Sequence, residues 1–390
     1  MQIIEVTTKQ HIQEFLKLPV SLYKDDKNWV RPLDKDIETV FNPEKNKQFQ
    51  HGICTRWILQ NEQQETVGRI AAFIDFDTMN KDNDQPTGGM GFFECINDQN
   101  AAFQLFDTGK AWLIAQNKGI EAVDAPINFG ERDSWWGCLV DGFHEPVYTM
   151  NYNHAYYNDL FTAYGFQDYF KQYTYVRTLA LPMHPRMEER GQKIIDTEGY
   201  SFRHLELKHM AKYAQDFCTI YNKAWGKHAG TKELTLADIM NLFNQMKPVI
   251  DEKIIWFAYY NDEPIAFYVQ ILDVNQVIKH TNGKMNLLGM ARFAYYKLFK
   301  KFNRIIGVVF GVVPEHQGKG VEMAIVKAYS WVAHTPKYPY ITMEMKWIGD
   351  FNPKMMKVCQ FVGGEIHKTH ITYRKLFDET KPFTRCPVIK

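Results

Sequence analysis

The stretch of this sequence with the clearest chemical potential is a turn that contains two glycines, Gly318 and Gly320. It follows residues 304–310, whose apolar composition is typical of a buried strand, and it precedes residues 323–329, whose composition is that of a helix. A turn from strand to helix directs unpaired backbone N–H groups and a helix N-terminus toward the space above it, which favours a bound pyrophosphate. Glycine at these two positions would let an anion approach the backbone closely.

Two familiar phosphate-binding patterns fit this turn poorly. A P-loop has Lys-Ser or Lys-Thr after its second glycine, and the dinucleotide fingerprint has a third glycine three residues further along. The sequence Gly318-Lys319-Gly320 shows neither feature. An ordinary glycine turn before a helix is the alternative that needs no ligand.

The longer string from Val312 to Gly320 has the order V-x-P-x-x-Q-G-x-G after a strand, and it resembles the acetyl-coenzyme A loop of the GCN5-related N-acetyltransferase (GNAT) family. The resemblance implies acetyl-CoA or another acyl-CoA as co-substrate, and no metal. It also implies that Val313 hydrogen-bonds the pantetheine arm. The implied pyrophosphate donors are the backbone N–H groups of Gln317, Gly318, Lys319, Gly320 and Val321.

One position departs from the family's pattern. The motif usually ends in glycine or alanine, whereas this chain has Glu322. A carboxylate there would repel a pyrophosphate unless the side chain swings away. The same glutamate also suits the start of a helix, where it complements the helix dipole.

In the GNAT family an amine attacks the thioester carbonyl directly, a base or a water chain deprotonates the amine, and a tyrosine often protonates the departing thiolate. That tyrosine normally lies seven residues after an asparagine. Asn352 is present and is carried over as a cofactor-binding residue, but the tyrosine position holds Cys359. We take Cys359 as a candidate acid, with a buried structural cysteine as the alternative. Asn352 would equally well cap a helix that has Pro353 at its first position.

Glu344 is the candidate base, because it stands alone among apolar neighbours in a predicted strand. Met343 and Met345 would lie on the opposite face of that strand. An ion pair of Glu344 with Lys346 or Arg374 is an equally good explanation of the carboxylate. Four histidines are further candidates for the base, and the sequence does not rank them: His280, His316, His367 and His370.

The predicted elements occur twice in the same order. Each half reads strand, helix, three strands, helix, strand, helix and strand, which is the element order of the acetyltransferase fold. Three pairs of residues recur about 199 positions apart, which favours an internal duplication: Trp57 and Trp256, Asp75 and Asp273, Asn153 and Asn352. We therefore predict an α/β protein with two tandem acetyltransferase-like domains, each with a central twisted mixed sheet flanked by helices.

The predicted domain boundaries follow from this repeat. Residues 1–181 form the first domain, and residues 182–199, which are charged and contain two prolines, form a linker. Residues 200–378 form the second domain, which carries the acyl-CoA loop, and residues 379–390 form a tail.

Three local expectations rest on residues that break or extend regular structure. Pro19 should end the first helix, residues 128–148 should form a long loop, and residues 365–377 should form a pair of strands.

The first copy lacks a glycine turn at the matching place, where Asp98 would disfavour an anion. We expect this copy not to bind coenzyme A and to serve as a lid or as half of the acceptor cleft. Its long loop carries Trp135, Trp136 and Phe143. The loop would either form a wall for the acceptor or pack across the interface between the two copies.

Composition limits the range of partners and compartments. The formal net charge of +1 gives no sign of a nucleic-acid or membrane partner. No apolar run is long enough to span a bilayer, and the N-terminus lacks the pattern of a signal peptide. The six scattered cysteines indicate free thiols in a reducing cytoplasm and argue against a zinc site.

These observations favour an acyl-CoA-dependent N-acyltransferase that moves an acetyl or other acyl group to the amine of a small molecule or peptide. The alternative is a catalytically degenerate pair of copies that binds a ligand or a partner protein, and Glu322 and Cys359 favour it. No residue pattern identifies the acceptor.

Overall fold

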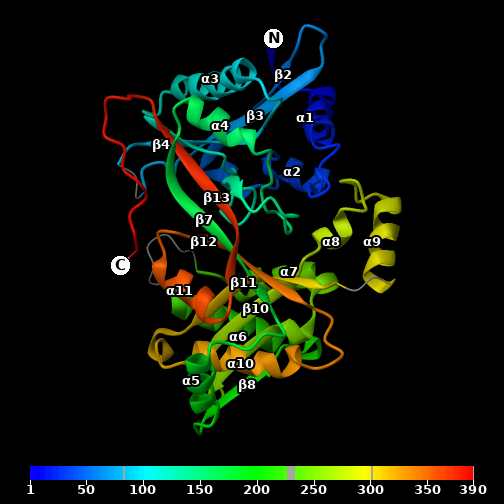
Figure 1. The fold of residues 1–390 in the computed structure, drawn as a ribbon, viewed down its shortest axis with the longest axis vertical. Helices are drawn as coiled ribbons and strands as arrows, with labels where there is room; N and C mark the ends of the chain where they lie inside the picture. The colour runs from blue at the N-terminus through cyan, green and yellow to red at the C-terminus, as the bar shows by residue number, and fades with distance from the viewer. Residues whose placement is uncertain (82–83, 226–232, 300–301, 390) are drawn as a thin grey trace.

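The computed structural model of the chain describes residues 1–81, 84–225, 233–299 and 302–389 (Figure 1). Within these residues the protein is built around one large mixed β-sheet of thirteen strands, and helices pack against it. The mixed α/β fold class predicted from the sequence is confirmed.

The first half of the chain contributes seven strands and four α-helices among the described residues. In chain order they are β1 (Gln2–Glu5), α1 (Lys9–Leu22), α2 (Asp34–Val40), β2 (Gly52–Gln60), β3 (Thr66–Asp75), β4 (Thr87–Cys95), α3 (Gln99–Ala115), β5 (Ala122–Ala125), β6 (Cys138–Asp141), α4 (Tyr156–Ala163) and β7 (Gln167–Thr178).

Among the residues that the structure describes, the second half has six strands in a matching order, without a counterpart of β6, and adds helices. Its elements are α5 (Pro185–Ile195), β8 (Tyr200–His204), α6 (Met210–Trp225), α7 (Leu236–Met246), β9 (Ile255–Tyr260), β10 (Glu263–Leu272), α8 (Asn275–Ile278), α9 (Leu287–Phe299), β11 (Arg304–Val312), α10 (Val321–Ala333), β12 (Thr342–Gly349), α11 (Pro353–Phe361) and β13 (Glu365–Leu376). The common ancestry of the two halves stays a prediction.

The two halves share the sheet because their last strands are exchanged. The strand order is β1-β2-β3-β4-β5-β13-β7-β12-β11-β10-β9-β8, with β6 paired to β13 beside this path. The last strand of the chain, β13, therefore lies next to β5 of the first half, and β7 lies next to β12 of the second half. The long antiparallel pair of β7 and β13 runs between the halves, as Figure 1 shows. The sequence boundaries proposed above thus do not separate two independent sheets, and they stay a prediction.

The first helix runs past Pro19, contrary to expectation, and ends at Leu22. Proline has no N–H, so the carbonyl of Phe15 loses its usual partner one turn later. The Arg69 guanidinium donates to that carbonyl at 2.6 Å and replaces the missing hydrogen bond. The helix continues because Tyr23 N–H donates to the Pro19 carbonyl at 2.9 Å.

Two other local expectations are also corrected by the structure. The segment expected to be a loop over 128–148 contains β6, which gains its hydrogen bonds from β13. The segment expected to be a strand pair over 365–377 is the single strand β13, which is interrupted by two bulges. The proposed linker contains α5, which packs against α10.

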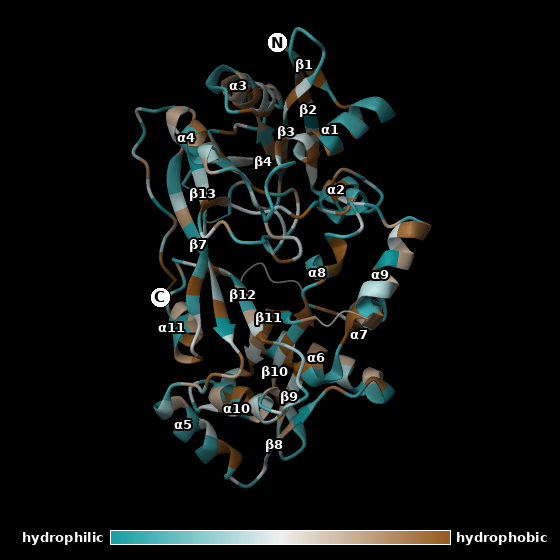
Figure 2. Cartoon of the chain, turned by 45° about the vertical axis from the view of Figure 1, so that its right-hand side comes forward, coloured by the Kyte–Doolittle hydropathy of each residue, from teal (hydrophilic) through white to brown (hydrophobic). Residues whose placement is uncertain are grey.

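Each half has its own hydrophobic core of buried side chains. Figure 2 shows apolar residues in the strands and helices of both halves. In the first half, Phe93 of β4 stacks on Phe106 of α3 at 4.7 Å between ring centroids. In the second half, Phe217 of α6 stacks on Phe267 of β10 at 4.4 Å. Burying side chains of this kind stabilises a fold by about 1.5–3 kcal/mol each. The sheet is thus packed against a hydrophobic core on both sides of the β7–β13 pair, where the two halves meet.

Candidate functional site

The candidate site begins where β11 and β12 part. Their parallel pairing runs from Arg304 opposite Thr342 to Gly307 opposite Met345. Beyond this point the pairing of the two strands ends, although β11 continues to Val312. The divergence opens a gap in the middle of the second half of the sheet.

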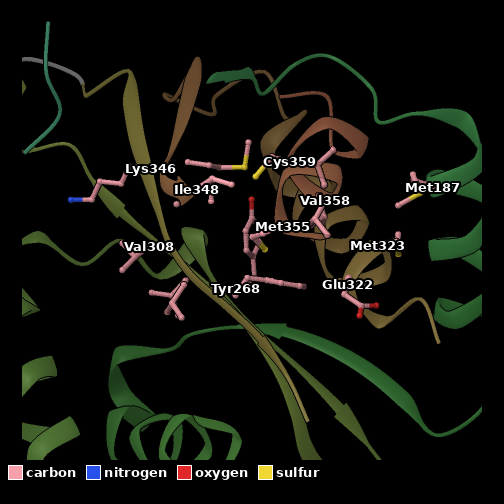
Figure 3. A pocket seen from close by; sticks show the side chains of 17 residues that line it. Met187, Tyr268, Val308, Glu322, Met323, Lys346, Ile348, Met355, Val358 and Cys359 are labelled. Carbon is pink, nitrogen blue, oxygen red and sulfur yellow. The ribbon is translucent and has the colours of Figure 1, made fainter. Parts of the chain in front are cut away.

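A pocket of about 90 Å³ lies on one face of this gap (Figure 3). Its walls come from β10, β11, β12, α5, α10 and α11. Most of the lining is apolar, and methionines from four elements contribute flexible, polarizable surface. The residues that line it are Met187, Tyr268, Val269, Gly307, Val308, Val309, Phe310, Glu322, Met323, Val326, Met345, Lys346, Ile348, Met355, Val358, Cys359 and Val362. This groove therefore suits an apolar chain.

The glycine turn lies between β11 and α10, beside the groove. Gly318 and Gly320 have φ angles of 71° and 106°, a region that favours glycine. Helix α10 begins at Val321, so the N–H groups of Val321 and Glu322 have no partner within the helix, whereas those of Met323 and Ala324 donate to the Gly320 carbonyl. The backbone geometry that the sequence predicts for an anion-binding turn is present.

Several backbone groups of the turn are already engaged. The Val313 N–H donates to the Ile265 carbonyl at 2.9 Å, and the Val313 carbonyl accepts from the His316 N–H at 3.0 Å. The Gln317 N–H donates to the Pro314 carbonyl at 3.3 Å. Val313 would contact a pantetheine arm only through the second lone pair of its carbonyl. The donors best placed for a ligand are thus those of residues 318–321.

Glu322 occupies the mouth of this turn. Its Oε1 accepts from the Gly318 N–H at 3.4 Å, and its Oε2 is buried without a hydrogen-bond partner among the described residues. Arg190 of α5 donates to the Gly318 carbonyl, and a Cβ atom added at Gly320 would lie 3.0 Å from the Arg190 side chain. A carboxylate of the protein itself thus stands at the position where an anionic ligand would be bound.

Asn352 and Cys359 lie at the two ends of α11 with different surroundings. The Asn352 side chain accepts from the Met355 N–H at 3.2 Å, so it caps the helix. Cys359 is fully buried in the groove wall, and burial raises the pKa of its thiol to about 12. An ordinary thiol has a pKa of about 8.5, so Cys359 is the weaker acid and a poor proton donor to a departing thiolate.

Glu344 lies on the opposite face of the sheet from the groove. Its side chain is only 1% exposed, and its Oε2 accepts from Lys368 Nζ at 2.6 Å. Arg304 is 3.7 Å from the other carboxylate oxygen. The two partners considered from the sequence are engaged elsewhere: Lys346 donates to the Asp133 and Tyr148 carbonyls, and Arg374 pairs with Asp124 at 2.6 Å.

His367 is the candidate histidine that lies next to Glu344. Its Nε2 is 3.9 Å from the Glu344 Oε1, and its ring stacks on His144 with 4.3 Å between centroids. Burial, aided by the charge of Lys368, lowers the pKa of His367 to about 4, so the imidazole is neutral near pH 7.

The other three histidines have different partners. His370 is buried and hydrogen-bonds the Asn151 carbonyl, His316 bonds the Tyr200 hydroxyl, and His280 stacks on Tyr296. His144 and Lys368 were not predicted, because their separation from Glu344 in the sequence carries no local signal.

The face of the sheet opposite the groove is polar: it carries Glu344 with its partners Arg304 and Lys368. Lys346 completes this polar face, and its side chain points away from the groove in Figure 3. Its ammonium donates to the Asp133 carbonyl at 3.0 Å and to the Thr149 hydroxyl at 3.1 Å. Burial lowers the pKa of Lys346 to about 8. Glu145 pairs with Arg304 at 2.8 Å. The long loop of the first half therefore packs between the copies, one of the two roles considered for it.

The corresponding gap in the first half is closed by its own backbone. The Ile127 N–H donates to the Met90 carbonyl at 2.7 Å, and a Cβ atom at Gly91 would lie 1.7 Å from the Ile127 carbonyl oxygen. Asp98 caps α3 by accepting from the Ala101 N–H at 2.8 Å. This geometry favours a first half without a cofactor.

Two features are absent from the described ranges. No group of three or more His, Cys, Asp or Glu side chains there is arranged to hold a metal ion. No helix in the same ranges has the length and apolar character needed to cross a membrane.

Comparison with known proteins gives distant but nearly full-length similarity. No family model matches the chain. The bacterial ceramide synthase of Caulobacter vibrioides is 27% identical over 383 residues, which cover 96% of this chain and 97% of that protein. Protein YghO of Escherichia coli K12 is 24% identical over 372 residues, covering 94% and 93% of the two chains.

Among solved structures, a tandem GNAT protein from the clavulanic acid biosynthesis pathway superposes over 97% of this chain and 99% of its own, with a TM-score of 0.54 and 9% identity. A likeness at this identity concerns the fold. It agrees with the repeated element order, the parting of β11 and β12, and the glycine turn at the head of α10. The chain therefore has a fold like that of tandem GNAT proteins, which is the fold that the sequence resemblance implies.

Proposed function

We propose that this protein is an acyltransferase that moves a fatty acyl group from an acyl-CoA thioester to the amine of a long-chain lipid. The observation that carries the proposal is the apolar groove between the diverging strands β11 and β12, next to the glycine turn of α10. The groove would hold the acyl-pantetheine part of the donor, and the turn would hold its pyrophosphate.

The lining of the groove favours an acyl group longer than acetyl. Met187, Met323, Met345 and Met355 enter it from four different elements. Unbranched methionine side chains adapt to irregular apolar ligands. Each methylene of a chain buried there contributes about 0.8 kcal/mol to binding.

The lipid amine is proposed from the named relative. A ceramide is the amide of a fatty acid with a long-chain amino alcohol, so a ceramide synthase forms an amide bond. The relative with that name aligns with 96% of this chain and with 97% of its own length. At 27% identity we transfer only the class of reaction, N-acylation of a lipid amine, and not a particular acceptor.

The polar face of the sheet supplies a base for this reaction. The amine nitrogen attacks the thioester carbonyl carbon through the gap, the C–S bond breaks, and coenzyme A leaves as a thiolate. The attacking nitrogen becomes cationic and loses a proton to the neutral imidazole of His367, which is a weak base at a pKa of about 4 and passes the proton on to the stronger base, the departing thiolate. Glu344 lies 3.9 Å from Nε2 and favours a proton on that nitrogen, which leaves Nδ1 as the acceptor. In this proposal Glu344 positions His367.

The donor site is tested by calorimetric titration of the protein with a long-chain acyl-CoA. We expect one saturable site, and at least a tenfold loss of affinity in Gly318→Asp, because the new carboxylate would face the pyrophosphate. Gly119→Asp is the matched control: the φ angles of Gly119 and Gly318 are 70° and 71°, and neither glycine has a neighbour within 4 Å of an added Cβ atom. Equal affinity in both variants would contradict the donor site. No binding at millimolar donor would favour a non-catalytic binding module.

A further inference from the structure

Helix α9 exposes far more apolar surface than a helix of a soluble protein ordinarily does. Of its thirteen residues only Gly289 is buried. Leu287 is 82% exposed, Leu298 75% and Phe299 71%. Leu288, Met290 and Tyr295 are also exposed. A contiguous surface of this kind usually marks a site of interaction with a protein or a membrane.

The apolar residues gather on the outer side of the helix. At about 100° per residue, Leu287, Ala291 and Leu298 lie along the middle of that side. The opposite side carries Phe293 and Tyr296, which are partly buried and pack against the core of the second half. The Tyr296 ring also stacks on His280, with 3.9 Å between centroids. The outer side is therefore held away from the protein, and α9 stands at the edge of the molecule in Figures 1 and 2.

Two cations border the apolar side. By the same helical spacing, Arg292 lies at one edge and Lys297 at the other. The sequence contains no Asp or Glu from residue 274 to residue 314. Lys284 precedes the helix, and the sequence adds Lys300 and Lys301, which lie outside the described residues. The net charge of +1 for the whole chain thus conceals a strongly basic segment.

We propose that α9 docks the protein on a lipid bilayer that contains anionic lipids. An apolar helix face with aromatic and aliphatic residues, bordered by Lys and Arg, is the arrangement that lies in the plane of a membrane interface. The basic border matches anionic head groups, and the absence of acidic residues removes repulsion from them. This differs from the expectation, drawn from net charge, that no membrane partner exists.

A protein docked on the bilayer could receive the lipid amine directly from the membrane. This delivery of the amine rests on the proposed function, whereas the docking itself does not. A short isolated helix is marginally stable in water, and α9 buries little of its surface against the protein. Contact with acyl chains would bury the outer side. Docking on a bilayer would therefore also stabilise α9 itself.

The test is co-sedimentation of the full chain with vesicles of phosphatidylcholine alone or mixed with phosphatidylglycerol. We expect binding to the anionic vesicles, weakened by salt. The double variant Leu298→Glu with Phe299→Glu should lose at least tenfold in affinity. Arg292→Ala should lose about fivefold. The matched control is Leu181→Glu with Val388→Glu, at positions that are 58% and 59% exposed elsewhere on the surface.

Three outcomes would overturn the proposal. The first is equal vesicle binding by the Leu298→Glu/Phe299→Glu variant and the wild type. The second is equal binding of the wild type to both kinds of vesicle. The third is that neither protein binds vesicles and that light scattering shows a dimer for the wild type but not for the variant. Circular dichroism shows whether the variant is folded.

A second assay, which measures acyl transfer to a long-chain amine dispersed in detergent, separates the two proposals. Vesicle binding without acyl transfer would refute only the proposed function. Acyl transfer without vesicle binding would refute only the docking.

Discussion

Replacing Glu322 by glutamine should tighten the binding of acyl-CoA. The Glu322 carboxylate lies 3.4 Å from the Gly318 N–H, at the place proposed for the pyrophosphate. Glutamine keeps the size of the side chain and an oxygen that can accept the same hydrogen bond, so the variant changes mainly the charge. The hydrogen bond itself is long, and its loss on ligand binding costs little.

The magnitude follows from the separation of the charges. If the carboxylate moves aside but stays about 5 Å from a phosphate charge, the repulsion is about 1 kcal/mol at the dielectric constant of water and about 3 kcal/mol at an effective value near 20. Removing the charge of Glu322 should therefore tighten acyl-CoA binding by about 5- to 150-fold. The gain should shrink as salt is added, because the mouth of the turn is open to solvent.

The assay is calorimetric titration of wild type and Glu322→Gln with the same acyl-CoA at low and at high salt. Glu315→Gln is the control, because it removes a charge from the same turn at an exposed position with no hydrogen bond to Gly318. Unchanged affinity in Glu322→Gln would refute the placement of the pyrophosphate at this turn. Weaker binding would show instead that the carboxylate holds the turn in its binding conformation.

Three further predictions concern groups whose pKa is shifted by burial. Cys359→Ala should change kcat less than tenfold, because a thiol with a pKa of about 12 is a poor donor to the leaving group; a loss of 100-fold or more would restore its role as an acid. His367→Gln should lower kcat by about 100-fold or more, with far less effect on acyl-CoA affinity, while Glu344→Gln should act on kcat in the same direction. His370, with an ordinary pKa of 6.5 and a folded pKa of about 4, should make the protein less stable as the pH falls between these values.

The sign for His370 follows from proton uptake. Above pH 6.5 neither the folded nor the unfolded state binds the proton, and below it the unfolded state binds the proton first. The free energy of unfolding should fall by about 2 kcal/mol by about pH 5 because of this group. Urea unfolding of wild type and His370→Asn across this range measures it, and equal slopes in the two proteins would contradict the assignment.

The sequence predicted those features of the site that depend on local order. The glycine turn, the strand before it and the helix after it lie within about thirty residues, so spacing alone predicts them. The cap formed by Asn352 and the poor setting of Asp98 for an anion are equally local. The repeat of elements was visible because each copy keeps the same order of strands and helices.

The features that were not predicted depend on distant parts of the chain. Pro19 stays within α1 only because Arg69 satisfies the Phe15 carbonyl from 54 residues away. The partner of Glu344 proved to be Lys368, which reaches it across β7 in the sheet. The exposure of α9 was hidden for a related reason: an apolar helix pattern does not tell whether a face meets the core or the solvent.

The exchange of β7 and β13 explains why a first half without an open cofactor cleft still contributes to the site. Because β7 pairs with both β12 and β13, the first half is fixed against the polar face of the second. Its long loop supplies His144, which stacks on His367, and Glu145, which pairs with Arg304. A single copy of the fold would leave these groups facing water, and the pKa of His367 would return toward its ordinary value of 6.5. The first half thus contributes through His144 and Glu145 and not through a cofactor of its own. Closing its cleft with Ile127 therefore removes no part of the proposed reaction.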